Sequence, residues 1–251
     1  MRKSFFYLIL GIFCLGLISN QSFAQFTAPE TVIGLHINGN IATNEGYGVG
    51  SSIYGGNFSG ATYGMKYGRG IGLDFSYGLG NTKRNRLTLG VEWNAMINAN
   101  SSAVPFLLIS PDEAIITYYN IISGSVGYQY MFNARCRQKQ WVGIALTASS
   151  ISAPRYSVVN FETALRGGVA LSTGYDWVLG DSGKWGLSIY GKYHIVNAFF
   201  HENSSTPGGA GHINDGNGQP GAGYDRYMGL LSINVAINMY GGVKSLTGLM
   251  K

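Results

Sequence analysis

Residues 63–79, YGMKYGRGIGLDFSYGL, alternate between two kinds of side chain along their whole length. The odd positions carry Tyr, Met, Tyr, Arg, Ile, Leu, Phe, Tyr and Leu, whereas every even position carries glycine or a polar residue. A period of two predicts a β-strand, because successive side chains point to opposite faces of the pleat. Strands of soluble sheets usually have about five or six residues. A strand of this length, with small residues on its polar face, is compatible with few folds.

The same alternation recurs in seven other segments. In each segment Leu, Ile, Val and aromatic residues share one face, and Gly, Ser, Asn and other polar residues share the opposite face. Together with the opening stretch they predict eight strands. The seven segments are residues 31–42, 87–94, 116–132, 142–147, 161–177, 185–195 and 227–239.

The connections between the expected strands differ in length in a regular way. Short connections, GNTKRN, NARCRQKQ and GDSGK, follow the second, fourth and sixth strands, and longer ones follow the first, third, fifth and seventh. An even number of strands with short turns at one end and longer loops at the other is typical of outer-membrane barrels, whose short turns face the periplasm. The sequence therefore predicts an all-β fold, an eight-stranded antiparallel up-and-down transmembrane β-barrel.

The start of the chain has the pattern of a cleaved secretory signal. Arg2 and Lys3 precede an apolar run over residues 5–18, and the small residues Ser22 and Ala24 precede a cleavage point after Ala24. The apolar run is shorter than the roughly 20 residues that a spanning helix needs, which disfavours an uncleaved anchor. We therefore expect a signal peptide, an outer-membrane barrel and a short periplasmic tail, at residues 1–24, 25–240 and 241–251.

Composition narrows the possible partners. Charged residues make up 12% of the chain, about half the usual quarter. The formal charge of +5 falls to 5 − 2 = +3 without Arg2 and Lys3, and the basic residues form no stripe for nucleic acid. Cys136 is the one cysteine left after cleavage, so an intrachain disulfide is not possible.

The chain resembles the small eight-stranded outer-membrane proteins, and the resemblance covers residues 26–240. It rests on the preceding signal, the alternation of side chains and the unequal lengths of the connections. This group contains the membrane domain of outer-membrane protein A, its OmpX-like and OmpW-like relatives, and the outer-membrane barrel-domain proteins common in the Bacteroidetes. The resemblance implies a porin-like barrel in the outer membrane of a Gram-negative bacterium. It implies outer-membrane lipids and the barrel-assembly machinery as partners, and an extracellular or envelope protein bound through the loops. One departure is the tail GGVKSLTGLMK after Tyr240, since such barrels often end on an aromatic residue.

Aromatic residues near the short connections suggest a membrane-interface girdle, because amphipathic rings favour the headgroup level. The residues expected there are Tyr77, Tyr128, Tyr130, Phe132, Trp141, Tyr175, Trp177 and Trp185.

Two small-barrel families are enzymes that act on lipid A, a palmitoyl transferase and a deacylase. The deacylase places its histidine and serine two residues apart, whereas His201 is followed by Glu202, Asn203 and Ser204, and His194 has Val196 two residues on. A calcium-loop reading of HINDGNGQ fails because Ile213 and Tyr224 would occupy ligand positions. We expect no catalytic residue, cofactor or metal.

Charged residues on the glycine-bearing faces predict a polar network in the lumen. Asp74 and Glu92 are expected to lie almost opposite each other, and facing carboxylates repel unless a cation intervenes. Lys192, helped by Arg166 and His194, is the expected cation. In the alternative, strand stagger separates these groups and water solvates each one.

Three functions follow from these expectations. The first is a non-enzymatic barrel with a surface-interaction or envelope-structural role. The second is a lipid A-modifying enzyme, either a deacylase or an acyltransferase. The third is a soluble exported barrel that carries an apolar ligand, which would need polar residues outside and apolar residues inside.

Overall fold

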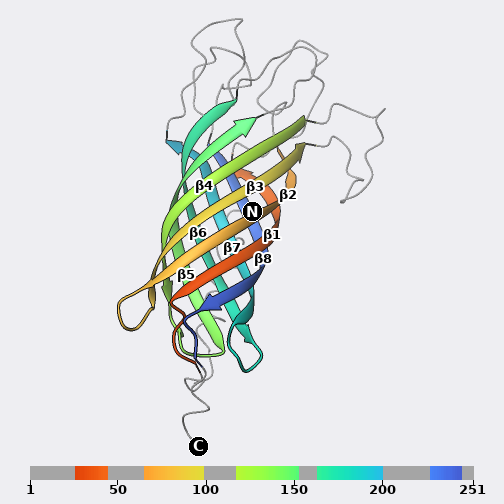
Figure 1. Ribbon diagram of the computed structural model, residues 1–251. Helices are drawn as coiled ribbons and strands as arrows, with labels where there is room; N and C mark the ends of the chain where they lie inside the picture. Colours follow the sequence, from red (N-terminus) through yellow and green to blue (C-terminus); the bar gives the residue numbers. More distant parts are fainter. Residues whose placement is uncertain (1–25, 45–64, 99–116, 153–162, 200–226, 245–251) are drawn as a thin grey trace, which may run out of the picture.

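The computed structural model describes residues 26–44, 65–98, 117–152, 163–199 and 227–244, which form a closed antiparallel barrel (Figure 1). Each strand pairs with its neighbour in sequence, and the last pairs with the first. Among the described residues, no helix is long and apolar enough to span a membrane. The eight strands are β1 (Thr31–Asn44), β2 (Tyr67–Leu79), β3 (Asn85–Asn98), β4 (Thr117–Met131), β5 (Gln138–Ser152), β6 (Ala164–Leu179), β7 (Trp185–Phe199) and β8 (Met228–Gly241).

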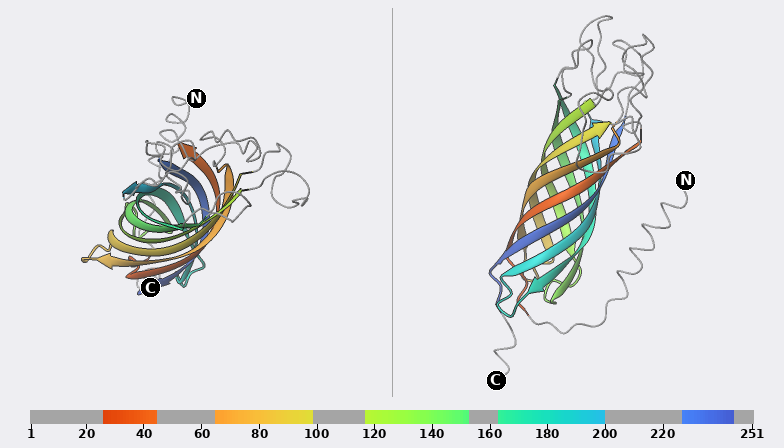
Figure 2. Two further views of the ribbon diagram at one scale, coloured as in Figure 1. Left: turned by 90° about the horizontal axis from the view of Figure 1, so that it is seen from above. Right: turned by 90° about the vertical axis from the view of Figure 1, so that its right-hand side faces the viewer.

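The register of the pairs fixes the tilt of the strands. Following paired residues from Leu79 through every strand and back to β2 leads to Arg69, a displacement of 79 − 69 = 10 residues. An eight-stranded barrel with a stagger of this size has strands tilted by roughly 40° and a bore that side chains fill. The tilt is visible in the side view, and the closed ring of strands in the view from above (Figure 2).

Side chains alternate between the lumen and the outer surface. The outward positions carry large apolar residues that stay exposed, such as Ile37 at 63%, Val91 at 60% and Ile233 at 67%. The inward positions carry buried polar residues, including His36, Asn40 and Glu92. The polarity is therefore inverted relative to a soluble barrel. In the opening stretch, the glycine-bearing face lines the lumen and the apolar face is outside.

Some expected boundaries differ from the observed ones. The alternation of residues 63–79 placed Met65 on the outward face, but β2 begins at Tyr67 and Met65 is fully buried at one end of the lumen. The expected strand at 142–147 is the centre of a longer one, because β5 continues into inward-facing Ser149 and Ile151 and outward-facing Ser150 and Ser152. The expected starts at residues 116 and 161 lie outside the described residues.

Three short connections lie at one end of the barrel, which we call the short-turn end; the opposite end is the far end (Figure 1). Residues 26–30 and 241–244 also meet at the short-turn end, and we call them the terminal clasp. The Glu30 amide donates to the Gly241 carbonyl at 2.9 Å, and the Thr27 amide donates to the Lys244 carbonyl at 2.9 Å. The two ends of the barrel segment are thus joined beneath the strands.

Glycine is needed on the inner face where a neighbouring side chain crosses the strand. Gly72 pairs with His36 on one side and Glu92 on the other. A Cβ at Gly72 would lie 2.4 Å from the His36 ring and 2.9 Å from the Val91 carbonyl oxygen. Gly124 faces outward, and a Cβ there would meet nothing within 4 Å.

We expect Gly72→Ala to destabilise the barrel by about 1 to 3 kcal/mol, because the added methyl group overpacks a filled lumen. The measurement is the urea midpoint of the refolded protein. Gly124→Ala is the matched control and should keep the midpoint of the parent. Equal midpoints for the two variants would show that the close approach at Gly72 has no energetic weight.

Candidate functional site

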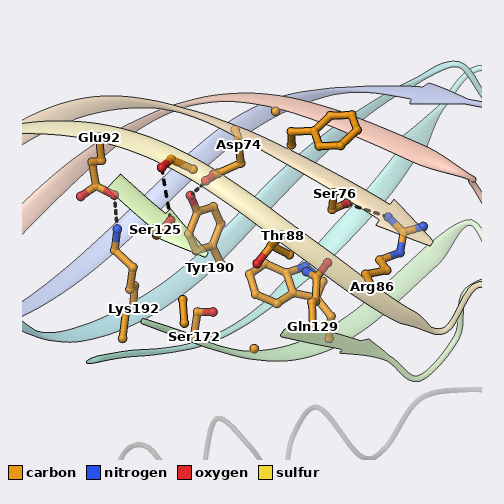
Figure 3. A pocket seen from close by; sticks show the side chains of 18 of the residues that line it. Asp74, Ser76, Arg86, Thr88, Glu92, Ser125, Gln129, Ser172, Tyr190 and Lys192 are labelled. Atoms are coloured by element: carbon orange, nitrogen blue, oxygen red, sulfur yellow. Dashed lines mark hydrogen bonds and ion pairs between the residues drawn. The ribbon is translucent and has the colours of Figure 1, made fainter. Parts of the chain in front are cut away.

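An ion pair crosses the middle of the lumen. Lys192 on β7 points across to Glu92 on β3, and its Nζ donates to Glu92 Oε2 (Figure 3). The two strands are four apart in a ring of eight, so they lie on opposite walls. Both residues are at inward positions of their strands and line the same cavity. The narrow bore lets one lysine side chain reach the opposite wall.

His36 on β1 lies between the two carboxylates. Its Nδ1 is 2.9 Å from Asp74 Oδ2, and its Nε2 is 3.4 Å from Glu92 Oε2. The ring is almost completely buried, and the contacts are close in distance without the alignment of good hydrogen bonds. Asp74 also accepts a hydrogen bond from the Tyr190 hydroxyl at 3.2 Å (Figure 3). The carboxylates thus face His36 and Lys192, and they do not face each other.

Asparagine side chains extend this network toward the far end. The amides of Asn94 and Asn38 donate to Glu92 Oε1 at 2.6 and 3.1 Å. Asn40 donates to both of these asparagines, at 2.8 Å to Asn94 and 2.7 Å to Asn38. Buried polar groups are costly unless they are paired, and these contacts provide partners for every one of the three amides. We call His36, Asp74, Glu92, Lys192 and the three asparagines the lumenal network.

A cavity of about 140 Å³ lies next to the network on its short-turn side. Small residues such as Gly90, Ser125 and Ser172 line it. Its floor contains Arg86, which donates to Ser76 Oγ at 3.1 Å and to the Pro29 carbonyl at 2.9 Å. The volume suits several water molecules, for which the Ser125, Ser172 and Asp74 side chains in the wall are hydrogen-bond partners.

Buried clusters lie across the lumen at both ends. At the short-turn end Phe26 from the terminal clasp packs with Val32, Val178 and Tyr240, and the Lys139 ammonium lies over the rings of Phe26 and Tyr240. At the far end an apolar cluster fills the bore, and its residues are 0 to 5% exposed. Its members are Ala42, Met65, Met96, Tyr119, Ile121, Ile151, Ala164, Val196, Met228 and Leu230.

The structure brings together part of the predicted network. Lys192 contacts Glu92 directly, but Asp74 and Glu92 are not opposite each other, because Asp74 pairs with Gly90 and Glu92 with Gly72. His194 instead bonds to Thr147 Oγ1 at 2.8 Å, and Arg166 donates to the Leu165 carbonyl at 2.9 Å. The sequence analysis did not include His36, although the alternation places this residue on the inner face. Its contact with Glu92 depends on its distance from β3, which the alternation does not give.

The predicted girdle contains one error. Trp141 lies inside the barrel, is 8% exposed and donates from Nε1 to Asp176 Oδ1 at 2.8 Å. Its parity is that of Gly143 and Thr147, which face the lumen. Proximity to a short turn alone was misleading. The other girdle residues are exposed or half-buried near the short-turn end, namely Tyr77, Tyr128, Tyr130, Phe132, Tyr175, Trp177 and Trp185.

The candidate catalytic residues give no assembled site. His201, Glu202 and Ser204 lie outside the described residues, as does the HINDGNGQ segment. His194 is buried in the wall of the lumen beside Thr147. Within the described ranges, no group of three or more His, Cys, Asp and Glu residues could hold a metal ion.

No protein-family model matches the sequence, and no curated protein matches it. Among solved structures, the chain is similar to Neisserial surface protein A at 10% identity, with 84% of this chain and 97% of that chain covered and a TM-score of 0.48. OprG from Pseudomonas aeruginosa is similar at 9% identity, with 88% and 98% covered and a TM-score of 0.45. Ail, the attachment invasion locus protein of Yersinia pestis, is similar at 10% identity, with 86% and 100% covered and a TM-score of 0.42.

Removing the cation of the lumenal network should destabilise the barrel. Lys192→Met leaves Glu92 buried without its ion partner, and breaking a buried pair from one side costs about 3 to 5 kcal/mol. The double change Lys192→Met with Glu92→Gln should recover part of that loss. Urea midpoints of the refolded proteins measure both effects, with Lys184→Met, an exposed lysine at the short-turn end, as the control. Three midpoints equal to that of the parent would mean that the pair is solvated by water.

Proposed function

We propose that this protein is an integral outer-membrane barrel without enzymatic activity, with a surface-interaction or envelope-structural role. The observation that carries the proposal is the outward face of the strands. It presents a belt of exposed Leu, Ile and Val, with aromatic residues at the short-turn end. Contiguous apolar surface of this extent requires a lipid or protein partner. Because all strand edges are paired, the barrel satisfies its backbone groups in a bilayer.

The lumen supports a role that does not depend on solute passage. The lumenal network occupies the middle of the bore, and buried clusters lie at both ends. Eight-stranded barrels have a bore just wide enough for side chains to fill. A recognition role then falls to the segments that join the strands at the far end, since connecting segments carry specificity on a rigid scaffold.

The two alternative functions have less support. A lipid A-modifying enzyme needs a nucleophile and base within reach of lipid on the outer surface, and His194 is on the lumen side. A soluble carrier of an apolar ligand needs polar residues on its outer surface, whereas the outward positions here carry exposed Leu, Ile and Val side chains. Lipid A mass spectra with and without the protein would test the enzyme, and an unchanged spectrum favours the barrel role.

The protein should fractionate with the outer membrane and migrate differently on a cold detergent gel before and after boiling. A closed barrel has no unpaired edge at which detergent can begin to unfold it. Recovery in the soluble periplasmic fraction would contradict the membrane proposal.

The charge at the short-turn end predicts the orientation. Exposed or half-buried basic residues outnumber the acidic Glu30 and Asp181 there by 6 − 2 = 4. Arg86 and Lys139 also lie near this end of their strands, but they are buried inside the barrel and are left out of this count. Basic residues favour an anionic leaflet, here the phospholipids on the periplasmic side. The six residues are Lys83, Arg84, Arg135, Arg137, Lys184 and Lys244.

An epitope tag inserted within residues 208–218, which lie outside the described residues, should therefore be stained on intact cells. A tag at Arg137, in a short turn, should be stained only after the outer membrane is permeabilised. The reverse staining would overturn the orientation and leave the barrel itself in place.

A further inference from the structure

Among the strand residues that the structure describes, one charged side chain faces outward, and it is Arg69 on β2. It is exposed on the outer face of the barrel. The cost of a charged side chain on the lipid face depends on its depth in the bilayer, so the height of Arg69 decides which membrane groups it meets. The other charged strand residues point into the lumen: Asp74, Arg86, Glu92, Lys139, Arg166, Asp176 and Lys192.

The surroundings of Arg69 leave space beside its guanidinium group. Its paired neighbours on the adjacent strands are Gly39 and Ala95, the smallest side chains available. A Cβ at Gly39 would meet nothing within 4 Å. Tyr67 and Ile71 are the next outward residues on β2. None of these neighbours carries a carboxylate, so the described surface around Arg69 lacks a counter-charge.

The height of Arg69 corresponds to a membrane interface. Arg69 lies 77 − 69 = 8 residues along β2 from Tyr77, an exposed aromatic residue at the short-turn end. At about 3.3 Å per residue and a tilt of roughly 40°, this spacing amounts to about 20 Å along the barrel axis. The apolar belt of such barrels is about 25 Å tall. Arg69 therefore reaches the headgroup level of the far leaflet. The exposed Trp93 lies near the same level, because it pairs with Ile71, the next outward residue on β2.

We infer that Arg69 binds the phosphate group of a lipid in the leaflet at the far end of the barrel. The guanidinium group presents a planar fork of donors that matches a phosphate in bidentate geometry. The gap over Gly39 and Ala95 admits the headgroup, and Tyr67 provides an aromatic wall beside it. In the proposed orientation this leaflet is the outer one, so the ligand is phosphorylated lipid A; the inference rests on the proposed function in this respect.

The test is a titration of the refolded, detergent-solubilised protein with lipid A, followed by native mass spectrometry. Arg69→Gln should weaken binding about tenfold, the size expected for losing a charged hydrogen-bond donor. Gly39→Phe should also weaken binding, because it fills the gap and leaves the charge in place. Lys184→Gln removes an exposed basic residue at the short-turn end and should bind as the parent does.

The ligand source is separated by two further titrations. With lipid A from which the phosphates have been removed, the parent and Arg69→Gln should bind equally weakly. Inorganic phosphate alone should not displace intact lipid A. Equal affinity of the parent and Arg69→Gln for intact lipid A would overturn the inference, and so would full displacement by inorganic phosphate, which would indicate a free-anion site.

Failure of this inference can be distinguished from failure of the proposed function. A parent protein that does not insert into phosphatidylcholine vesicles and shows no boiling-dependent gel shift contradicts the membrane proposal. A parent protein that inserts and binds lipid A, with Arg69→Gln unchanged, contradicts only the role of Arg69. Each variant is first checked for the gel shift. If Arg69→Gln does not fold, Gly39→Phe still tests the site, because it blocks the gap beside Arg69 and leaves the charge of Arg69 in place.

Discussion

The closure of eight strands with a displacement of ten residues determines most of this molecule. It sets the tilt of the strands, and with it the width of the bore and the residues that share a height. The narrow bore makes opposite walls accessible to one another. For this reason a single lysine on β7 reaches a glutamate on β3. In a wider barrel the same two residues would each face water.

The charged side chains in this lumen need hydrogen-bond and ion-pair partners, and they also need glycine residues that leave room for them. His36 and Glu92 approach each other over Gly72, where any side chain would collide with the imidazole ring. The inner face therefore combines large polar residues on one strand with glycine on the next. A large polar side chain beside a glycine fills the bore and keeps hydrogen-bond partners close to it. Buried polar groups need such partners.

Much of the fold could be predicted from the sequence because one face of each strand had to be apolar. A period of two identifies a strand and assigns each residue to a face, and this was enough for eight strands and for an inward Lys192. It was not enough for Met65 or Ile151, since apolar residues turn inward where the far end of the lumen is filled. The alternation assigns Trp141 to the inner face, where it lies, whereas its position near a short turn suggests the interface.

The site was harder to predict than the fold, because it depends on distances across the barrel. Those distances follow from the register of all eight strands, which no single segment contains. His36 shows the difficulty: its face was evident, but its neighbours Asp74 and Glu92 come from two other strands. Arg166 and His194 were on the correct face, and their contacts include the Leu165 carbonyl group for Arg166 and Thr147 for His194.

The terminal clasp constrains the order in which the molecule can be completed. The acceptors for Glu30 and Thr27 are the Gly241 and Lys244 carbonyl groups, which become available only with the last strand. Phe26 packs against Tyr240, which also arrives at that stage. The seam between β1 and β8 and the closure of the short-turn end are therefore coupled events. A nascent barrel that lacks β8 has both an open side and an open floor, and the arrival of a single strand removes both.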